Sequence, residues 1–370
     1  MLTYEAFLRR ESHFDGKVFV GVKTTGIYCL PSCTAKKPRR ENVVFLHTRE
    51  EALRSGFRSC RVCFPSLPVR KWLDRGHTVS LSTPENFSFE ECIKFLSRSS
   101  NECLHHIEDN QIHKAIKVND RPILLRISKA MGGINLEFLN PCPHKPTRLA
   151  AAEFVCEWFD LFSDMTTFYE FAEKDLVLGK LVRGYKGLPL IGIPDLFEAI
   201  TWAIIGQQIN LSYAYTLKRN FVTRFGGRLV QGDRAYWLFP EAERISRSTV
   251  SELTDVGLSR RKSEYIIHLA NEFGVGSVSK KGLLENGFAA SYEKLLKLRG
   301  VGDWTANYVM MRCLRYSAAL PISDIGLHNA IKQLLKLNEK PEIKDIRELF
   351  NRWKGFEAYA TFYLWRSLIP

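Results

Sequence analysis

The chain has 370 residues, too many for one compact core, so we expect two or three domains. A hydrophobic content of 45% excludes a disordered chain, and no stretch approaches the roughly 18 apolar residues that would span a membrane. The net charge of +13 predicts a polyanionic partner, nucleic acid first, and no membrane or protein partner is implied.

The positive charge is concentrated at the two ends of the chain. Formal charges are +8 for residues 1–75, −5 for 76–175 and +10 for 176–370. This distribution favours nucleic-acid binding by both ends, and a purely solubilising role is the alternative. The first residues, "MLTYEAFLRRESHFDGK", contain no secretory signal, so we expect a cytoplasmic protein whose nine cysteines are thiols or metal ligands.

Four segments are predicted in chain order, giving a multidomain α+β protein. Residues 1–65 have short strands and turns, and residues 66–76 have the composition of a linker. Residues 77–146 show the alternation of an antiparallel sheet, with strands expected at 77–84, 112–119, 122–130 and 134–140 and one helix within 87–100. Residues 147–370 have helical periodicity nearly throughout.

Four cysteines near the N-terminus have the spacing of a zinc site. Cys29 and Cys33 form a C-x3-C pair, and Cys60 and Cys63 form a C-x2-C pair 26 residues later. Two close thiol pairs joined by a loop suit tetrahedral Zn²⁺, and unrelated surface thiols are the alternative. The remaining five cysteines are isolated: 92, 103, 142, 156 and 313. Four of them lie in apolar surroundings and are expected to be small core residues.

The sequence around these cysteines resembles the N-terminal zinc domain of the Ada family. The similar stretches are "FDGKVFVGVKTTGIYCLPSC", "RRENVVFL" and "ALRSGFRSCRVCFP". The resemblance implies a bacterial, DNA-associated protein in which Cys29 accepts a methyl group from methylphosphotriesters in DNA, with Cys33, Cys60 and Cys63 as the other zinc ligands. In that family a helix-turn-helix regulator usually follows, whereas here the strand-rich segment follows. The basic residues after the first pair would meet the phosphate backbone, with a solvated loop as the alternative: Lys36, Lys37, Arg39 and Arg40.

A second motif lies in the helical part. "LLKLRGVGDWTANYVMMR" (295–312) predicts two helices joined by a turn with Gly300 and Gly302, whose exposed amides suit a DNA phosphate; an ordinary helical turn is the alternative. Downstream, Asp324 begins an amphipathic helix, where its simplest role is an N-cap.

Hairpin and downstream aspartate together resemble the helix-hairpin-helix superfamily. With "DLFEAITWAIIGQQIN" and "YATFYLWR", residues 77–370 resemble the AlkA-type 3-methyladenine DNA glycosylases specifically. The resemblance implies a catalytic Asp324, DNA contacts by Gly300 and Gly302, a wedge at Gln208 and a monovalent cation at the hairpin carbonyls. It also implies a pocket for the alkylated base made of Trp304, Tyr308 and Trp365, which as single aromatics would more often be core residues.

These residue types suit cleavage of an N-glycosidic bond. A carboxylate stabilises the positive charge that develops on the sugar, and aromatic rings hold a flipped, cationic base. Bifunctional members carry a lysine where this chain has Trp304, so the resemblance implies a monofunctional, type II enzyme acting on alkylated double-stranded DNA. The alternatives are a non-enzymatic alkylation sensor or DNA-binding regulator, and a glycosylase for oxidised or deaminated bases.

Overall fold

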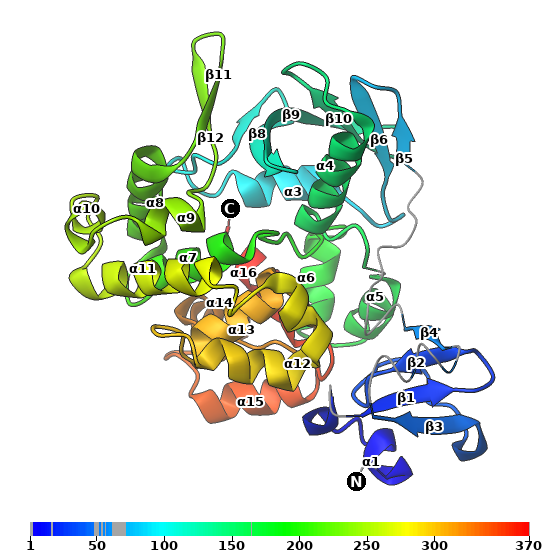
Figure 1. Ribbon diagram of the computed structural model, residues 1–370. Coiled ribbons are helices and arrows are strands. Elements are labelled where there is room, and N and C mark those ends of the chain that lie inside the picture. Colours follow the sequence, from blue (N-terminus) through cyan, green and yellow to red (C-terminus); the bar gives the residue numbers. More distant parts are fainter. Residues whose placement is uncertain are drawn as a thin grey trace. The chain divides into compact units, whose positions relative to one another are not determined.

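The computed structural model, drawn in Figure 1, describes residues 3–15, 18–47, 52, 55, 57–60, 72–163 and 165–369. The chain divides into two compact units, residues 1–69 with 278–298 and residues 70–277 with 299–370. The predicted multidomain α+β class is confirmed by an N-terminal sheet, a six-stranded antiparallel sheet and a large set of helices. Cys63 and residues 66–71 of the predicted linker lie outside the described residues.

The first unit contains a four-stranded sheet of order β3-β1-β2-β4. Helix α1 (Tyr4–Leu8) is capped by Thr3 and packs Phe7 against Val20 of the central strand β1. Helix α12 (Lys280–Leu296) also belongs to this unit and is interrupted at Gly287, which has a φ of +76°. The other elements are η1 (Ser12–Phe14), β1 (Phe19–Val22), β2 (Ile27–Cys29), η2 (Arg40–Asn42), β3 (Val43–Leu46) and β4 (Arg58–Ser59).

The second unit begins with the six-stranded sheet of order β5-β6-β10-β9-β8-β7. Val79, Leu136, Ile127 and Ile112 stand opposite one another on four neighbouring strands, and all four are fully buried. Helix α4 (Lys145–Trp158) packs on β6 and β8 and covers this face (Figure 1). The strands are β5 (Trp72–Asp74), β6 (Thr78–Ser82), β7 (His106–Glu108), β8 (Gln111–Val118), β9 (Arg121–Ala130) and β10 (Gly133–Phe138).

Four short strands lie where none was predicted. Strand β5 pairs with β6, so this part of the predicted linker 66–76 lies in the sheet, and β7 pairs with β8. The hairpin β11 (Arg228–Gln231) and β12 (Arg234–Trp237) interrupts the predicted helical part and packs Tyr236 against Ala115 and Leu124. Strands of three or four residues have too few repeats for a periodic pattern. They form here because β5 and β7 find a partner strand in the large sheet, while β11 and β12 pair with each other.

Helices make up most of the remaining chain, as predicted. Helix α7 (Leu196–Gly206) is buried on nearly all sides and runs through the middle of this set. None of the helices within the described ranges has the length and apolarity needed to cross a bilayer. The others are α3 (Phe89–Leu96), α5 (Thr166–Ala172), α6 (Leu178–Gly184), α8 (Leu211–Phe225), α9 (Ala242–Ser246), α10 (Val250–Thr254), α11 (Arg260–Gly274), α13 (Asp303–Arg312), α14 (Ile325–Leu335), α15 (Ile343–Asn351) and α16 (Glu357–Arg366).

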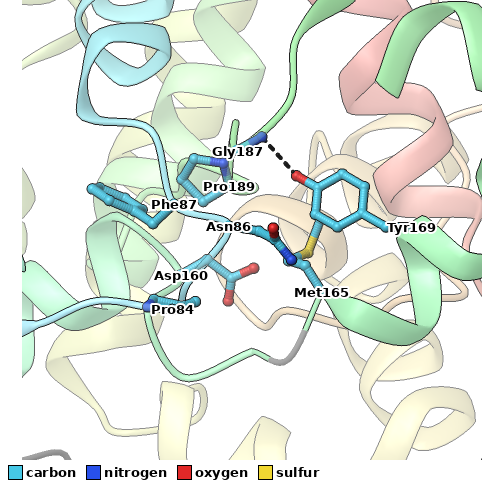
Figure 2. A pocket seen from close by; sticks show the side chains of 8 residues that line it. All are labelled: Pro84, Asn86, Phe87, Asp160, Met165, Tyr169, Gly187 and Pro189. Carbon is cyan, nitrogen blue, oxygen red and sulfur yellow. Dashed lines mark hydrogen bonds between the residues drawn. The ribbon is translucent and has the colours of Figure 1, made fainter. Parts of the chain in front are cut away.

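Gly187, in the loop between α6 and α7, forms hydrogen bonds to the start of α3 and to α5. Its carbonyl accepts from the Ser88 amide at 2.9 Å. Its amide donates to the Tyr169 hydroxyl, also at 2.9 Å (Figure 2). Its φ is +87°, and a Cβ there would lie 2.6 Å from the Asn86 carbonyl oxygen, so only glycine fits. The small pocket of Figure 2 has a volume of about 10 Å³, enough for about one water molecule. It lies where the loop before α3 meets the segment that contains Gly187, and we assign it a structural role.

A buried ion pair joins the loop before β7 to helix α8. Glu102 and Lys218 are 2.6 Å apart with side-chain exposures of 10% and 7%, and the other carboxylate oxygen of Glu102 accepts from the Cys103 and Leu104 amides. Burial alone would raise the pKa of Glu102, but Lys218 overcomes this effect and holds the pKa well below its usual value. The pair is therefore ionised, and its contribution to stability is complete above pH 4.5 and declines as the pH falls below that value.

We predict that Lys218→Met destabilises the chain by about 3–5 kcal/mol, because it leaves the Glu102 carboxylate buried without a counter-charge. Urea unfolding measures the loss. The control is Lys129→Met, whose partner Glu90 is 56% exposed and whose loss should cost at most about 1 kcal/mol. Equal midpoints for the two variants would contradict the assigned role of the buried pair.

Candidate metal centre and candidate active site

Three of the four predicted metal ligands lie together at the end of strand β2. Cys29 ends that strand opposite Val20, Cys33 follows after one turn, and the Cys60 amide donates to the Tyr28 carbonyl. The three sulfur atoms lie within 4.8 Å of one another and all three residues are buried. Cys63, the fourth predicted ligand, lies outside the described residues.

The thiol geometry suits a tetrahedral zinc ion. The Sγ atoms of Cys33 and Cys60 are 3.8 Å apart. This is much longer than a disulfide bond and equals the sulfur–sulfur edge, about 3.8 Å, of a tetrahedron with Zn–S distances of about 2.3 Å. The Cys33 and Cys60 sulfurs are therefore spaced as two ligands of one zinc ion, and Cys29 lies close enough to join them.

The loop between Cys29 and Cys33 is held by two side chains. Asp15, only 2% exposed, accepts from the Ser32 amide at 3.0 Å and from the Ser32 hydroxyl at 2.5 Å. Lys37 donates to the Pro31 carbonyl at 2.8 Å and lies 3.7 Å from the centre of the Phe7 ring. Burial raises the pKa of Asp15 to about 6, although the bonds from Ser32 oppose this shift.

The basic residues predicted to contact DNA differ in exposure. Lys36, Arg39 and Arg40 are exposed, and Arg39 lies 4.0 Å from Glu41. The Lys37 ammonium is instead engaged inside the domain, with the Pro31 carbonyl and the Phe7 ring. The first three thus present charge to solvent, while Lys37 also holds the cysteine loop.

The glycine turn before α13 is tightly built. Gly300 has a φ of +89°, and a Cβ there would lie 2.4 Å from the Tyr265 ring, so this position requires glycine. Gln207, which sequence reasoning passed over, donates to the Gly300 carbonyl at 2.8 Å and to the Thr305 hydroxyl at 3.0 Å. Gly302 is the exposed N-cap of α13 and has no side chain to cap its amides.

Gln208 lies next to this contact, between α7 and α8. It is exposed and adopts the left-handed conformation with a φ of +57°. Lys262 donates to the carbonyls of Ile205 and Gln207 at 2.8 Å each. These bonds fix the C-terminal end of α7, directly before Gln208. Its wedge role stays a prediction.

Asp324 is the point at which three helices meet. One carboxylate oxygen, Oδ1, accepts from the Leu327 amide at 2.7 Å and from Nε1 of Trp365 at 2.8 Å. The other, Oδ2, accepts from Nε1 of Trp304 at 3.0 Å. Asp324 is therefore the N-cap of α14 and also the acceptor for two indoles, which lie on α13 and α16.

Gly326 makes room for this arrangement. A Cβ at Gly326 would lie 2.9 Å from Oδ1 of Asp324 and 3.5 Å from the Trp365 ring. The position therefore needs glycine for lack of space. A glycine two residues after Asp324 is the sequence signal from which this close packing could have been predicted.

The three predicted pocket aromatics lie together around Asp324. Trp304 stacks on Tyr308 with ring centres 5.4 Å apart, and Tyr308 lies 6.0 Å from Trp365. Trp304 and Trp365 are partly exposed, whereas Tyr308 is buried. The set thus forms one aromatic wall next to a carboxylate that accepts three hydrogen bonds.

Two further residues hold Tyr308 and were missed in the sequence. Its hydroxyl accepts from Nε1 of Trp202 at 2.8 Å and from the Arg312 guanidinium at 3.2 Å. Trp202 is 106 residues away in the chain, so no local pattern indicates the contact. Arg312 is only 5% exposed, and it lies one helical turn after Tyr308.

Two family profiles match the chain. The family described as "Metal binding domain of Ada" matches residues 3–66. The "HhH-GPD superfamily base excision DNA repair protein" matches residues 201–355. Both resemblances stated from the motifs are confirmed.

Similar proteins cover either most of the chain or nearly all of it. The DNA-3-methyladenine glycosylase of Bacillus subtilis (strain 168) is 41% identical over 80% of this chain and 99% of its own. The probable bifunctional transcriptional activator/DNA repair enzyme AlkA of Mycobacterium tuberculosis is 45% identical over 99% of this chain and 96% of its own. The solved 3-methyladenine DNA-glycosylase from Archaeoglobus fulgidus, at 24% identity, covers 77% of this chain and 96% of its own with a TM-score of 0.66, which shows the shared fold.

We predict that Asp15→Ala weakens zinc binding by about 5- to 150-fold, because the partly buried amide and hydroxyl of Ser32 lose their acceptor at a cost of about 1–3 kcal/mol. Competition with a zinc chelator measures the affinity. The control is Asp255→Ala, which removes an exposed carboxylate from the other unit. Unchanged zinc retention in Asp15→Ala would show that the carboxylate does not hold the cysteine loop.

Proposed function

The chain belongs to the DNA-3-methyladenine glycosylases that carry an Ada-type metal-binding domain, and we propose that Asp324 and Cys29 perform its two reactions. It is a DNA alkylation-repair enzyme and its partner is DNA. The base-excision proposal rests above all on the Asp324 carboxylate, which three N–H donors hold beside the aromatic wall.

In the proposed excision, Asp324 acts on the sugar of the flipped nucleotide. A carboxylate has about four acceptor positions, and three donors occupy Asp324, so one position on Oδ2 is left for the sugar or a water molecule. As the bond from C1′ to the base breaks, its electron pair leaves with the base and the sugar becomes positively charged. The carboxylate stabilises this charge, and water then adds to C1′ and loses its proton.

The aromatic wall is proposed to hold the departing base. Trp304, Tyr308 and Trp365 offer electron-rich faces, which attract a base that carries positive charge after alkylation of a ring nitrogen. Such a base leaves as a neutral molecule and needs no protonation. This chemistry supports a preference for the 3-methyladenine class of lesions.

We further propose a monofunctional, type II enzyme. A lyase reaction needs an amine that forms a Schiff base with the sugar. By the family resemblance, bifunctional members carry this amine on a lysine at the position of Trp304. Here the Trp304 indole donates to Asp324 instead. The expected product is an intact abasic site.

For the second reaction we propose that Cys29 receives a methyl group from a DNA methylphosphotriester. The site would consist of Cys29, Cys33, Cys60 and Cys63, and Zn²⁺ bound there keeps its sulfur ligands deprotonated. The Cys29 sulfur donates an electron pair to the methyl carbon, the carbon–oxygen bond breaks, and its electron pair stays on the phosphate as a diester. Lys36, Arg39 and Arg40 supply exposed positive charge for the DNA backbone.

The remaining DNA contacts are proposals as well. Gly300 and Gly302 would grip a phosphate with backbone amides, and Gln208 would fill the gap that the flipped base leaves. A monovalent cation at the hairpin carbonyls is proposed on the family resemblance alone.

We predict that Asp324→Asn lowers base release from methylated DNA by at least about 100-fold, while DNA affinity stays nearly unchanged. Asparagine keeps an oxygen for the Leu327 amide but loses the charge that stabilises the sugar. The measurement is single-turnover base release together with DNA binding. Asp195→Asn is the matched control, since Asp195 caps α7 in the same way through the Glu198 amide; normal turnover by Asp324→Asn would refute the assignment.

We predict that Cys29→Ser abolishes methyl transfer from DNA to the protein and leaves base release intact. The serine oxygen is a far weaker nucleophile than a thiolate, and Asp324 and the aromatic wall belong to the other unit. Counting labelled methyl groups per protein chain measures the transfer. Cys142→Ser, outside the thiol cluster, should behave like the wild type; label still entering Cys29→Ser would mean that the acceptor is elsewhere.

A further inference from the structure

A cavity lies in the second unit between the sheet and the helices. Residues that line it come from the turn after α3 (Arg98), from β8 (Lys114), from α7 (Glu198, Trp202) and from α13 (Arg312). Its volume is about 50 Å³, room for about four water molecules and thus for one small ion. It adjoins the candidate active site, because Trp202 and Arg312 both donate to the Tyr308 hydroxyl.

One ion pair in the cavity wall has no net charge. Lys218 lies 2.6 Å from Glu102, and the remaining acceptor capacity of that carboxylate is taken up by two backbone amides. This pair leaves no net charge for a ligand.

Three cations in the same wall have neutral partners only. Arg312, 5% exposed, donates to the Ile191 carbonyl at 2.8 Å and to the Tyr308 hydroxyl. Lys114, 7% exposed, donates to the Leu104 carbonyl at 3.2 Å, and Arg98 donates to the Phe95 carbonyl at 2.8 Å. Over the described ranges, none of the three forms an ion pair with a carboxylate.

Among the described residues that line the cavity, one carboxylate remains outside the Glu102–Lys218 pair. Glu198 lines the cavity, and burial raises its pKa to about 6 although Lys114 and Lys218 oppose this shift. Even when ionised, it leaves two of the three positive charges uncompensated. Burial of an uncompensated charge costs several kcal/mol, and a counter-ion removes most of that cost.

We propose that this cavity binds a small oxyanion, with the charge and size of inorganic phosphate, through Arg98, Lys114 and Arg312. The volume is too small for a nucleotide, so the ligand is a free ion rather than the DNA backbone. The negative charge of the ion balances the two excess positive charges, and its oxygens accept from N–H groups of the three cations.

Occupancy of the cavity would influence the aromatic wall, a consequence that rests on the proposed function. The Arg312 guanidinium lies 5.5 Å from the centre of the Tyr308 ring. Its positive charge repels a cationic base held against that ring, and an anion bound to Arg312 reduces the repulsion. The oxyanion therefore favours excision of cationic bases over neutral ones.

The test is titration of the full chain with inorganic phosphate in the absence of DNA, followed by calorimetry. We expect Lys114→Met to weaken phosphate binding by at least about tenfold and Glu198→Gln to strengthen it by at least about fivefold. General damage to the fold cannot produce this opposite pair of effects. Lys129→Met removes an exposed lysine and should bind like the wild type.

Absence of phosphate binding, or equal binding by Lys114→Met, Glu198→Gln and wild type, would overturn the proposal and indicate adventitious binding only. Because the titration uses no DNA, its failure is distinct from failure of the glycosylase proposal. The link to the aromatic wall is tested by base release in phosphate and in chloride at equal ionic strength. We expect phosphate to raise release of a cationic base relative to a neutral one, and an unchanged ratio would refute that link.

Discussion

The candidate active site depends on one carboxylate that accepts three hydrogen bonds. Leu327 belongs to the same helix as Asp324, whereas Trp304 and Trp365 come from two other helices, so the position of the carboxylate ties together α13, α14 and α16. This carboxylate is partly buried, and each lost partner leaves a polar group unsatisfied, so the arrangement tolerates few errors in geometry. The capping role and the proposed catalytic role of Asp324 therefore require the same arrangement.

The two candidate sites differ in what happens to the reacting group. A carboxylate that stabilises charge is unchanged after each turnover, whereas a thiolate that accepts a methyl group is consumed. The surroundings of the two groups differ in the same way. Asp324 stands beside an aromatic wall that can release its base, and Cys29 lies in a small unit whose cysteine loop is fixed by Asp15 and Lys37.

Features with a local sequence signal were predicted well. The cysteine spacing placed Cys29, Cys33 and Cys60 together, and the turn with Gly300 and the downstream Asp324 were recognised before the structure. Long alternating strands were also found, because eight to ten residues give several repeats of the pattern. The specific roles of these residues in DNA repair came from family resemblance, and their chemistry stays a prediction.

Features that depend on distant partners were missed. Trp202 bonds to Tyr308 across 106 residues, and Gln207 reaches the Gly300 carbonyl across 93 residues. Strands β5, β7, β11 and β12 are too short to show a period, and each exists because a neighbouring strand offers a partner. The cluster of charged residues around the cavity could not be predicted for the same reason, since Lys114, Glu198 and Arg312 are far apart in the sequence.

The central claim is that one chain removes alkyl groups by two independent chemistries. The most direct measurement exposes the protein to DNA that carries both methylated bases and methylphosphotriesters, and counts free bases and protein-bound methyl groups in the same sample. We expect bound methyl to stop at one group per chain, on the peptide that contains Cys29, while base release continues through many turnovers. Base release that stops once Cys29 is methylated, or methyl groups bound at another residue, would contradict the claim.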